Sequence, residues 1–238
     1  IGDIIGHMPT DISQRSNIEA VEVDEVTGNI LKLLYPDAKV NVNGFEKTKI
    51  ANGSVDLAIT NVPFVTGLRV FDDSGDKDLS KLFGNIHDFC IAKNVRKLRE
   101  GGIGIFITSS GTMDRSDALR AWVTNEGNAD FIGAFRLNNK TFGGTSVTSD
   151  IIIIRKRVNG QHSEQAINVG DVTAERVAEY ETGETKRKNG TSVPVVKTLS
   201  MLYNKYFMEH PENMAGKMDF GFEHGDSYRP ESAGLYPN

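Results

Sequence analysis

The first 157 residues of the chain alternate short apolar runs with stretches of helical periodicity. The apolar runs, which we interpret as strands, are residues 18–23, 39–42, 55–60, 103–108, 131–137 and 150–155. Strands that alternate with helices in this way are typical of an α/β fold built on a parallel sheet. This rhythm constrains the fold more than any other feature of the chain, and it predicts a mostly parallel sheet.

Residues 24–34 form the clearest predicted helix. Val26, Ile30 and Leu33, together with Leu34, recur at helical spacing and share one face. Asp24 stands at the position where a side-chain oxygen caps the first turn. Further helices are predicted over residues 86–98 and 118–123.

The last two predicted strands are separated by residues 138–149, which contain two glycines and no helical period. A parallel return needs a crossover of about a dozen or more residues, usually a helix. We therefore expect these strands to pair antiparallel, as a hairpin that closes the sheet. The apolar density falls after residue 157, so we predict a core over residues 1–157 and a C-terminal appendage or linker region over residues 158–238.

The composition excludes several classes of protein. With 38% hydrophobic residues and a net charge of −5, the chain can bury a core, but no apolar run approaches the roughly 20 residues of a membrane span. The single cysteine, Cys90, cannot form an internal disulfide, and no Cys or His spacing fits structural zinc. We expect a cytoplasmic protein without membrane contact or metal. Because the chain opens within the glycine turn of residues 1–6, we also expect it to be a fragment of a longer polypeptide.

The residues Asn61, Val62, Pro63 and Phe64 directly follow the strand predicted over 55–60. Ligands of open α/β sheets bind outside the carboxyl ends of the strands, so this location is favourable for a site. Asparagine offers a carbonyl acceptor and an amide donor, proline stiffens the backbone, and phenylalanine offers a flat face for stacking. Together they fit a planar group that bears an exocyclic amine, whose lone pair becomes more nucleophilic when the amine donates hydrogen bonds.

A second group of residues suits a nucleoside-bearing cofactor. Gly2 and Gly6 permit close approach of the backbone to a ligand. Glu22 lies at the end of the next predicted strand, where an acidic side chain can accept hydrogen bonds from both ribose hydroxyls. These residues alone do not distinguish a nicotinamide cofactor from a sulfonium.

Several sequence blocks follow one another along the chain: GDIIG, AVEVDEVTGNILKLLYPDAKVNVNGFEK, VDLAITNVPF, IHDFCIAKNVRKLREGGIGIFITSSGTMD and FIGAFRLNNKTFGGTSVTSDIIIIRKR. In this order they resemble the catalytic core of the gamma-class N6-adenine DNA methyltransferases. They are most similar to the branch that writes its motif Asn-Val-Pro-Phe and lies within large helicase-linked phage, plasmid or mobile-element proteins. The resemblance covers roughly residues 1–157 and continues loosely through 205–218.

The resemblance implies a class I S-adenosylmethionine-dependent methyltransferase fold, which is Rossmann-like, with S-adenosylmethionine as the cofactor. Gly2 matches a glycine of the family's cofactor motif, and Glu22 matches its ribose-binding acid. Phe45 and Glu46 fall where the family contacts the adenine of the cofactor. The opening of the first motif, which normally precedes Gly2, is missing from this chain, so the resemblance implies an incomplete cofactor pocket and weak or no activity of this piece alone.

The resemblance also assigns the catalytic motif. Asn61 and the backbone carbonyl of Val62 would hold the target amine, Pro63 belongs to the same motif, and Phe64 would stack on the base. Phe142 falls where the family places a second aromatic side chain against the extruded base. The implied reaction is methyl transfer to the N6 amine of an adenine flipped out of DNA, as in restriction-modification systems.

The implied partners are DNA and, within the same polypeptide, helicase and target-recognition regions. Two alternatives stay open: methyl transfer to cytosine N4 or a glutamine amide, and an inert methylase-like module that binds DNA or a partner. The acidic residues at 72–78 lack the ligand spacing of a calcium loop, so we expect a solvated loop. We interpret the five histidines as surface or hydrogen-bonded residues. The basic runs 155–157 and 186–188 are read as exposed charge, with contact to phosphates as the alternative.

Overall fold

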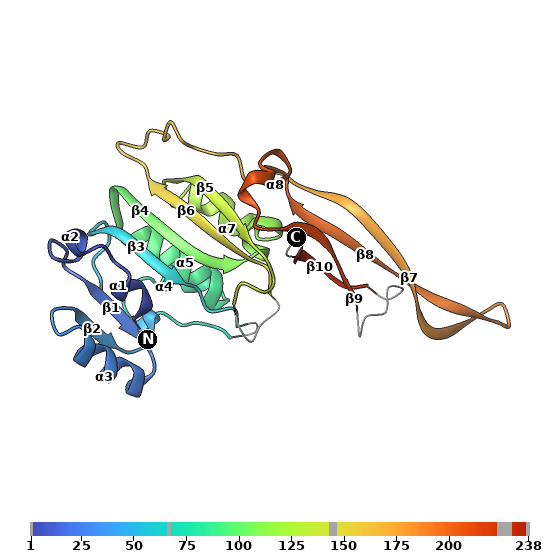
Figure 1. The fold of residues 1–238 in the computed structure, drawn as a ribbon, viewed down its shortest axis with the longest axis horizontal. Helices are drawn as coiled ribbons and strands as arrows, with labels where there is room; N and C mark the ends of the chain where they lie inside the picture. The colour runs from blue at the N-terminus through green and yellow to red at the C-terminus, as the bar shows by residue number, and fades with distance from the viewer. Residues whose placement is uncertain (1, 66–67, 143–146, 223–229, 237–238) are drawn as a thin grey trace.

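The computed structural model describes residues 2–65, 68–142, 147–222 and 230–236 of the chain. Figure 1 shows an α/β core from which a long two-stranded arm projects, formed by β7 (Val172–Lys188) and β8 (Thr191–Asn204). Two short helices, α1 (Asp3–Gly6) and α2 (Thr10–Ser13), precede the first strand. None of the helices within these ranges is long and apolar enough to cross a membrane.

The main sheet of the core has four strands in the order β3 (Val55–Asn61), β4 (Leu98–Ser109), β6 (Ser149–Lys156), β5 (Ala129–Leu137). β3 and β4 pair parallel. β6 runs antiparallel to β4 on one side and to β5 on the other. The main sheet is therefore mixed.

The prediction of a mostly parallel sheet is wrong, because β6 lies between β4 and β5 and runs opposite to both. The antiparallel pairing of the last two predicted strands is confirmed. It is forced by the segment between them, which contains no helix in its described part. That segment includes residues 143–146, which lie outside the described residues, so a closing hairpin is not part of the described structure.

A separate two-stranded parallel sheet is formed by β1 (Glu19–Glu22) and β2 (Lys39–Val42), which α3 (Glu25–Leu34) connects. Asp24 caps α3 as predicted, since its carboxylate accepts a 2.7 Å hydrogen bond from the Thr27 amide. The helix buries Leu31, whereas the predicted apolar face is exposed, with Val26 at 68% and Leu33 at 83%. Periodicity located this helix correctly, but the face it marks is not covered within the described structure.

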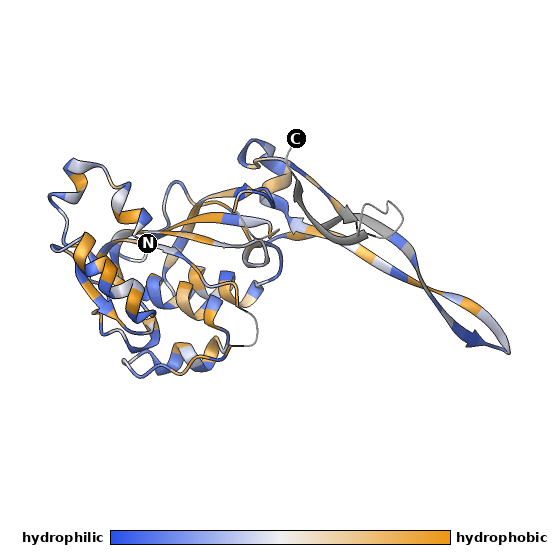
Figure 2. Ribbon diagram, turned by 60° about the horizontal axis from the view of Figure 1, so that its bottom comes forward, coloured by the Kyte–Doolittle hydropathy of each residue, from blue (hydrophilic) through white to orange (hydrophobic). Residues whose placement is uncertain are grey.

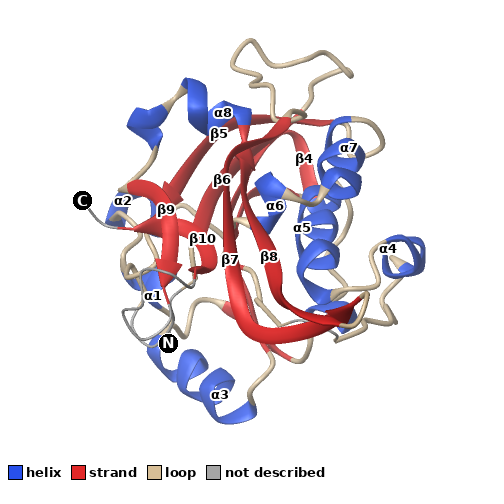
Figure 3. Cartoon of the chain, turned by 90° about the vertical axis from the view of Figure 1, so that its right-hand side faces the viewer, coloured by secondary structure: helices blue, strands red, loops and turns tan. Residues whose placement is uncertain are grey.

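The core lies where two helices pack on the main sheet. α5 (Ile86–Lys97) and α7 (Asp117–Thr124) lie side by side on one face of it (Figure 3). Figure 2 shows that the hydrophobic segments are concentrated in the helices and strands of the α/β core. Cys90 of α5 is 5% exposed, and burial raises the pKa of its thiol to about 12. The largest fully buried apolar side chains are Phe89, Phe106, Phe131, Phe207, Leu79, Ile91, Leu98, Met113, Leu119 and Ile152.

A buried ion cluster joins the sheet to the C-terminal part of the chain. The fully buried Arg136 of β5 donates to both carboxylate oxygens of Asp150 on β6, over 2.8 and 2.9 Å, and to Asp114 over 2.8 Å. Its guanidinium carbon lies 4.3 Å from the ring centroid of Phe207. Burial alone would lower the pKa of Arg136, but the two carboxylates outweigh burial and raise it. Asp114, which lies in α6 (Gly111–Asp114), has a raised pKa because burial outweighs the attraction of Arg136.

The C-terminal segment begins with the arm and returns to the core. Asn204, the last residue of β8, is fully buried, and its side-chain amide donates to the carbonyls of Met113 and Val169 over 2.9 and 2.8 Å. The segment continues through α8 (Lys205–Glu209), a 3-10 turn η2 (Pro211–Asn213), β9 (Lys217–Phe222) and β10 (Pro230–Tyr236). The domain boundary at residue 157 stays a prediction.

Candidate active site

The carboxyl end of β3 presents the motif that the sequence singled out. Asn61 is the last residue of β3, pairs with Ile107 of β4 and is exposed. Val62 is only 2% exposed, and its amide donates a 2.9 Å hydrogen bond to the Ile107 carbonyl. Because successive side chains of an extended chain point to opposite sides, the buried Val62 leaves the Asn61 amide accessible. Within the described residues, the Val62 carbonyl accepts no hydrogen bond.

Phe64 is half-buried beside His87, a residue that the sequence analysis did not select. Their ring centroids lie 6.4 Å apart at an interplanar angle of 49°. His87 is held at both ring nitrogens: Nδ1 lies 2.9 Å from Asp88 Oδ1, and Nε2 lies 2.5 Å from Thr108 Oγ1. Thr108 stands near the end of β4, the strand next to β3. The aromatic ring of the motif is thus placed beside a fixed imidazole.

The position of His87 follows from a reciprocal cap at the start of α5. Asn85 accepts a hydrogen bond from the Asp88 amide over 2.7 Å and donates to the Asp88 carboxylate over 3.0 Å. Burial would raise the pKa of Asp88, but the hydrogen bonds from His87, Asn85 and Ser116 outweigh burial and lower it. The spacing of Asn85 and Asp88 is a local signal from which the place of His87 in the first helical turn follows.

The residues predicted to hold the cofactor lie at the ends of β1 and β2. Glu22 ends β1 and is half-buried, and its Oε1 accepts a 3.0 Å hydrogen bond from the Asp24 amide. Within the described structure, its Oε2 has no hydrogen bond. Gly2 has a φ of 70°, and a Cβ atom there would lie 2.6 Å from the ring of Tyr35. Gly2 is therefore required by backbone conformation and by packing, whatever it binds.

Phe45 and Glu46 lie in the 3-10 turn η1 (Phe45–Lys47), which follows β2. The fully buried Lys93 of α5 reaches this turn: its Nζ lies 5.2 Å from the Phe45 ring centroid and donates to the Glu46 carbonyl over 3.4 Å. The Asp73 amide also donates to the Glu46 carbonyl, over 3.3 Å. The turn is thus tied to α5 and to the loop that follows the Asn61–Phe64 motif.

We expected that loop to be solvated, and this expectation is wrong for part of it. Asp72 and Asp76 are 3% and 2% exposed, and they pair at 2.6 Å with Lys93 and Lys97, respectively. Burial would raise the pKa of Asp72, but Lys93 and the backbone amides of Ser74 and Asp76 lower it to about 2. The expectation failed because the two lysines that neutralise these carboxylates lie 21 residues away along the chain.

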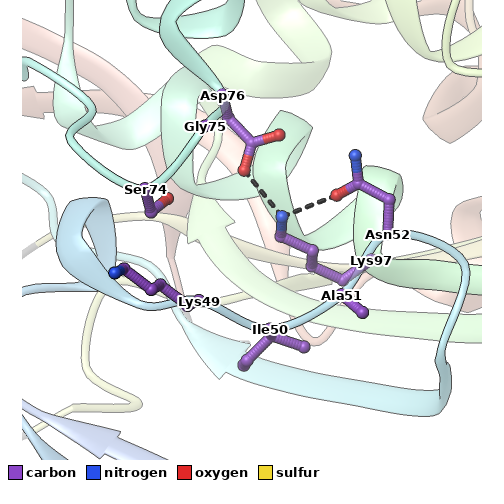
Figure 4. Close-up of a pocket in the computed structure, with 8 residues that line it drawn as sticks. All are labelled: Lys49, Ile50, Ala51, Asn52, Ser74, Gly75, Asp76 and Lys97. Atoms are coloured by element: carbon purple, nitrogen blue, oxygen red, sulfur yellow. Dashed lines mark hydrogen bonds and ion pairs between the residues drawn. The ribbon is translucent and has the colours of Figure 1, made fainter.

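The described structure contains a hollow of about 280 Å³ at the opposite end of β3 (Figure 4). Lys97 crosses it and donates to Asn52 Oδ1 and Asp76 Oδ2, each over 2.6 Å. The hollow is lined by Lys49, Ile50, Ala51, Asn52, Ser74, Gly75, Asp76 and Lys97. None of the predicted site residues lines it. The hollow surrounds the Lys97–Asp76 ion pair and is separate from the candidate site.

The structure brings some predicted residues together and leaves others apart. Asn61 to Phe64 form one group at the end of β3, and Phe45 with Glu46 form another at the end of β2. Among the described residues, no hydrogen bond joins these groups to each other or to Glu22. Phe142 is half-buried and follows β5, directly before residues 143–146, which lie outside the described residues. Its place opposite Phe64 stays a prediction.

The fold and the sequence of the chain were compared with those of known proteins. No family model matches the chain. A modification subunit of a putative type I restriction enzyme from Vibrio vulnificus YJ016 superposes with a TM-score of 0.52 at 12% identity, over 97% of this chain and 50% of that one. A putative class I S-adenosylmethionine-dependent methyltransferase from Listeria monocytogenes gives a TM-score of 0.46 at 18% identity, over 60% of this chain and 45% of that one. The superposition on the Vibrio vulnificus subunit thus shows that the two proteins share an α/β fold.

In sequence, the chain is similar to a phage protein. It is 30% identical over 141 residues to "Defense against restriction protein B" of Escherichia phage P1. The match covers 58% of this chain and 6% of the phage protein. This chain therefore corresponds to a small part of that relative.

Proposed function

We propose that this chain is the catalytic core of a DNA methyltransferase that transfers a methyl group from S-adenosylmethionine to the N6 amine of adenine. The observation that carries the proposal is the geometry at the end of β3. There an exposed amide side chain, a backbone carbonyl without a hydrogen bond in the described structure and a half-buried phenyl ring follow one another in four residues. This is the set of groups that grips a planar amine.

Each residue of the motif has a defined task in this reaction. The Asn61 side-chain oxygen and the Val62 carbonyl accept hydrogen bonds from the two N–H groups of the amine, which localises its lone pair on nitrogen. Phe64 stacks on the heterocycle and compensates for the stacking lost when the base leaves the duplex, an unstacking that costs a few kcal/mol. Pro63 fixes the backbone between them. When bound, S-adenosylmethionine supplies the electrophilic methyl group.

The cofactor-binding residues in this proposal are Gly2, Glu22, Phe45 and Glu46. Their chemistry fits the group: the Glu22 carboxylate keeps Oε2 available for ribose hydroxyls, and Phe45 offers an aromatic face to adenine. Lys93 positions the Phe45–Glu46 turn from behind. We further propose that DNA is the substrate, and that helicase and target-recognition regions belong to the same polypeptide. The matched segment is 6% of the phage P1 protein, a polypeptide long enough to hold further regions of this kind.

Two measurements test the proposal, both on a polypeptide that restores the opening of the first motif ahead of Gly2. Titration calorimetry with S-adenosylmethionine reports binding, and incubation with labelled cofactor and duplex DNA, followed by nucleoside digestion, identifies the product. N6-methyladenine is expected. N4-methylcytosine would move the reaction to another DNA acceptor, and cofactor binding without transfer to DNA would leave a glutamine amide as the acceptor or an inert module.

The role of Lys93 predicts a difference between two otherwise similar lysines. Lys93→Met and Lys97→Met each remove a buried ammonium from an aspartate. The loss of unfolding free energy should be about 3–5 kcal/mol for Lys93→Met and smaller for Lys97→Met, because Arg96 also contacts Asp76 at 3.3 Å. Only Lys93 touches the Phe45–Glu46 turn. Calorimetry on the folded variants should therefore show at least tenfold weaker S-adenosylmethionine binding, by about 1.4 kcal/mol, for Lys93→Met alone. Equal losses in both variants would contradict a positioning role.

A further inference from the structure

The arm formed by β7 and β8 carries its charge in an ordered way. Three consecutive cations, Lys186, Arg187 and Lys188, end β7 at the tip and are all exposed. The residues opposite them on β8 are Val193, Ser192 and Thr191, which are uncharged. Within the described residues, none of the three cations forms an ion pair. The tip is therefore a positive end on a chain whose net charge is −5.

The arm is built as a ribbon with a fixed base and a projecting tip. At its base, the side chain of the buried Asn204 donates to the carbonyls of Met113 and Val169. The backbone amide of Asn204 donates to the Asp114 carboxylate over 2.9 Å. At its tip, Asn189 and Gly190 adopt φ values of 52° and 83°, the left-handed pair that closes a tight two-residue hairpin. β7 has 17 residues, which at about 3.3 Å per residue gives a reach of roughly 50 Å. Figure 1 shows the arm projecting away from the core.

We propose that the tip of this arm binds duplex DNA through its phosphates, with Lys186, Arg187 and Lys188 as the contacting residues. The inference rests on the proposed function, because it extends the DNA contact beyond the methylated base. Three features favour DNA as the partner. The cations are not neutralised within the described chain, the opposite strand adds hydroxyl donors at Thr191 and Ser192, and a two-stranded ribbon fits the major groove.

The charge distribution adds a physical reason for the length of the arm. Glu179, Glu181 and Glu184 lie on β7 before the three cations and are exposed, with the exposed Lys197 opposite them on β8, so positive charge is concentrated at the tip. An acidic body repels the phosphate backbone, whereas a basic tip held far from it attracts the backbone. The arm thereby orients DNA relative to the core before the target base reaches Asn61.

The test measures DNA affinity as a function of salt for the whole chain. The variant Lys186→Gln/Arg187→Gln/Lys188→Gln is compared with the unsubstituted chain by fluorescence anisotropy, on a labelled duplex of about 30 base pairs between about 50 and 300 mM salt. The slope of log K against log salt is negative, and each lost phosphate contact reduces its magnitude by about 0.9. We expect the magnitude of the slope to decrease by about 2 to 3, and the affinity at about 100 mM salt to fall at least tenfold.

A charge-matched variant serves as the control. Lys32→Gln/Lys77→Gln/Lys81→Gln removes the same charge from exposed positions on α3 and on α4 (Lys77–Leu82). Its slope should change by less than about 1. The proposal is overturned if the tip variant keeps the slope of the unsubstituted chain, if the control loses as much, or if the unsubstituted chain does not bind DNA. An acidic protein as the true partner would give the first or the third result.

The outcome separates from that of the proposed function. Tip substitution should leave the S-adenosylmethionine affinity unchanged, because β1 and β2, which carry the proposed cofactor residues, lie at the end of the molecule away from the tip of β7 and β8 (Figure 1). If methyl transfer is absent but the salt slope still depends on the tip, the proposed function falls and the DNA-binding arm stands. If methyl transfer occurs and the slope ignores the tip, the arm has another role.

Discussion

Replacing Asn61 with alanine is expected to lower the rate of methyl transfer to DNA by about 10²- to 10³-fold. Its side-chain oxygen accepts a hydrogen bond from an amine that becomes positively charged in the transition state, and removing one such preorganised partner typically costs about 2.7–4 kcal/mol. Asn61 is exposed at the end of β3 and makes no side-chain hydrogen bond within the described structure. The free energy of unfolding should therefore change little. Single-turnover transfer of labelled methyl groups measures the effect.

Asn29→Ala is the matched control, because it removes the same amide from an exposed position on α3. It should leave the rate unchanged. Cofactor binding by both variants should equal that of the unsubstituted chain, since neither residue belongs to the proposed cofactor site. A full rate for Asn61→Ala would refute the assignment of the motif, whereas a loss of cofactor binding would point to a structural effect.

Replacing Arg136 with methionine is expected to destabilise the fold by about 3–5 kcal/mol. The change leaves Asp150 and Asp114 buried without the cation that both contact, and an uncompensated buried charge is costly. Urea denaturation of the chain measures the loss. Arg99→Met is the matched control, because Arg99 pairs with Asp56 at a site where both side chains are more than half exposed. Such pairs contribute about 0–1 kcal/mol.

A second substitution keeps this prediction decisive if Arg136→Met does not fold. Arg136→Met/Asp150→Leu removes both members of the strongest pair, and replacing a buried ion pair with apolar side chains is often tolerated. The double variant should be more stable than Arg136→Met alone. If the double variant were the less stable of the two, Asp150 would have to contribute through a partner other than Arg136.

The local parts of the fold could be predicted from sequence. The apolar run 55–60 became β3 (Val55–Asn61), and Asp24 caps α3, because both depend on neighbouring residues. The insertion of β6 between β4 and β5 could not be predicted, since strand order depends on contacts between distant segments. β7 was missed for a related reason: its residues are mostly polar, and it is held by pairing with β8 rather than by an apolar core.

The candidate site also contains residues that could be predicted from local sequence and residues that could not. Asn61 to Phe64 are placed by the end of one strand, so their position followed from a few residues. Lys93 was missed because its partners lie elsewhere in the chain: Asp72 is 21 residues away and Glu46 is 47 residues away. Its burial becomes visible only once α5, the loop and η1 are packed together.

The buried thiol of Cys90 can be used to measure how often the protein opens. Thiolate is the form that reacts with alkylating reagents, and a thiol with a pKa of about 12 holds almost none of it at neutral pH. Cys90 is the single cysteine of the sequence. Alkylation at neutral pH is therefore expected only when the protein opens enough to expose Cys90, and its rate measures those openings without any engineered label.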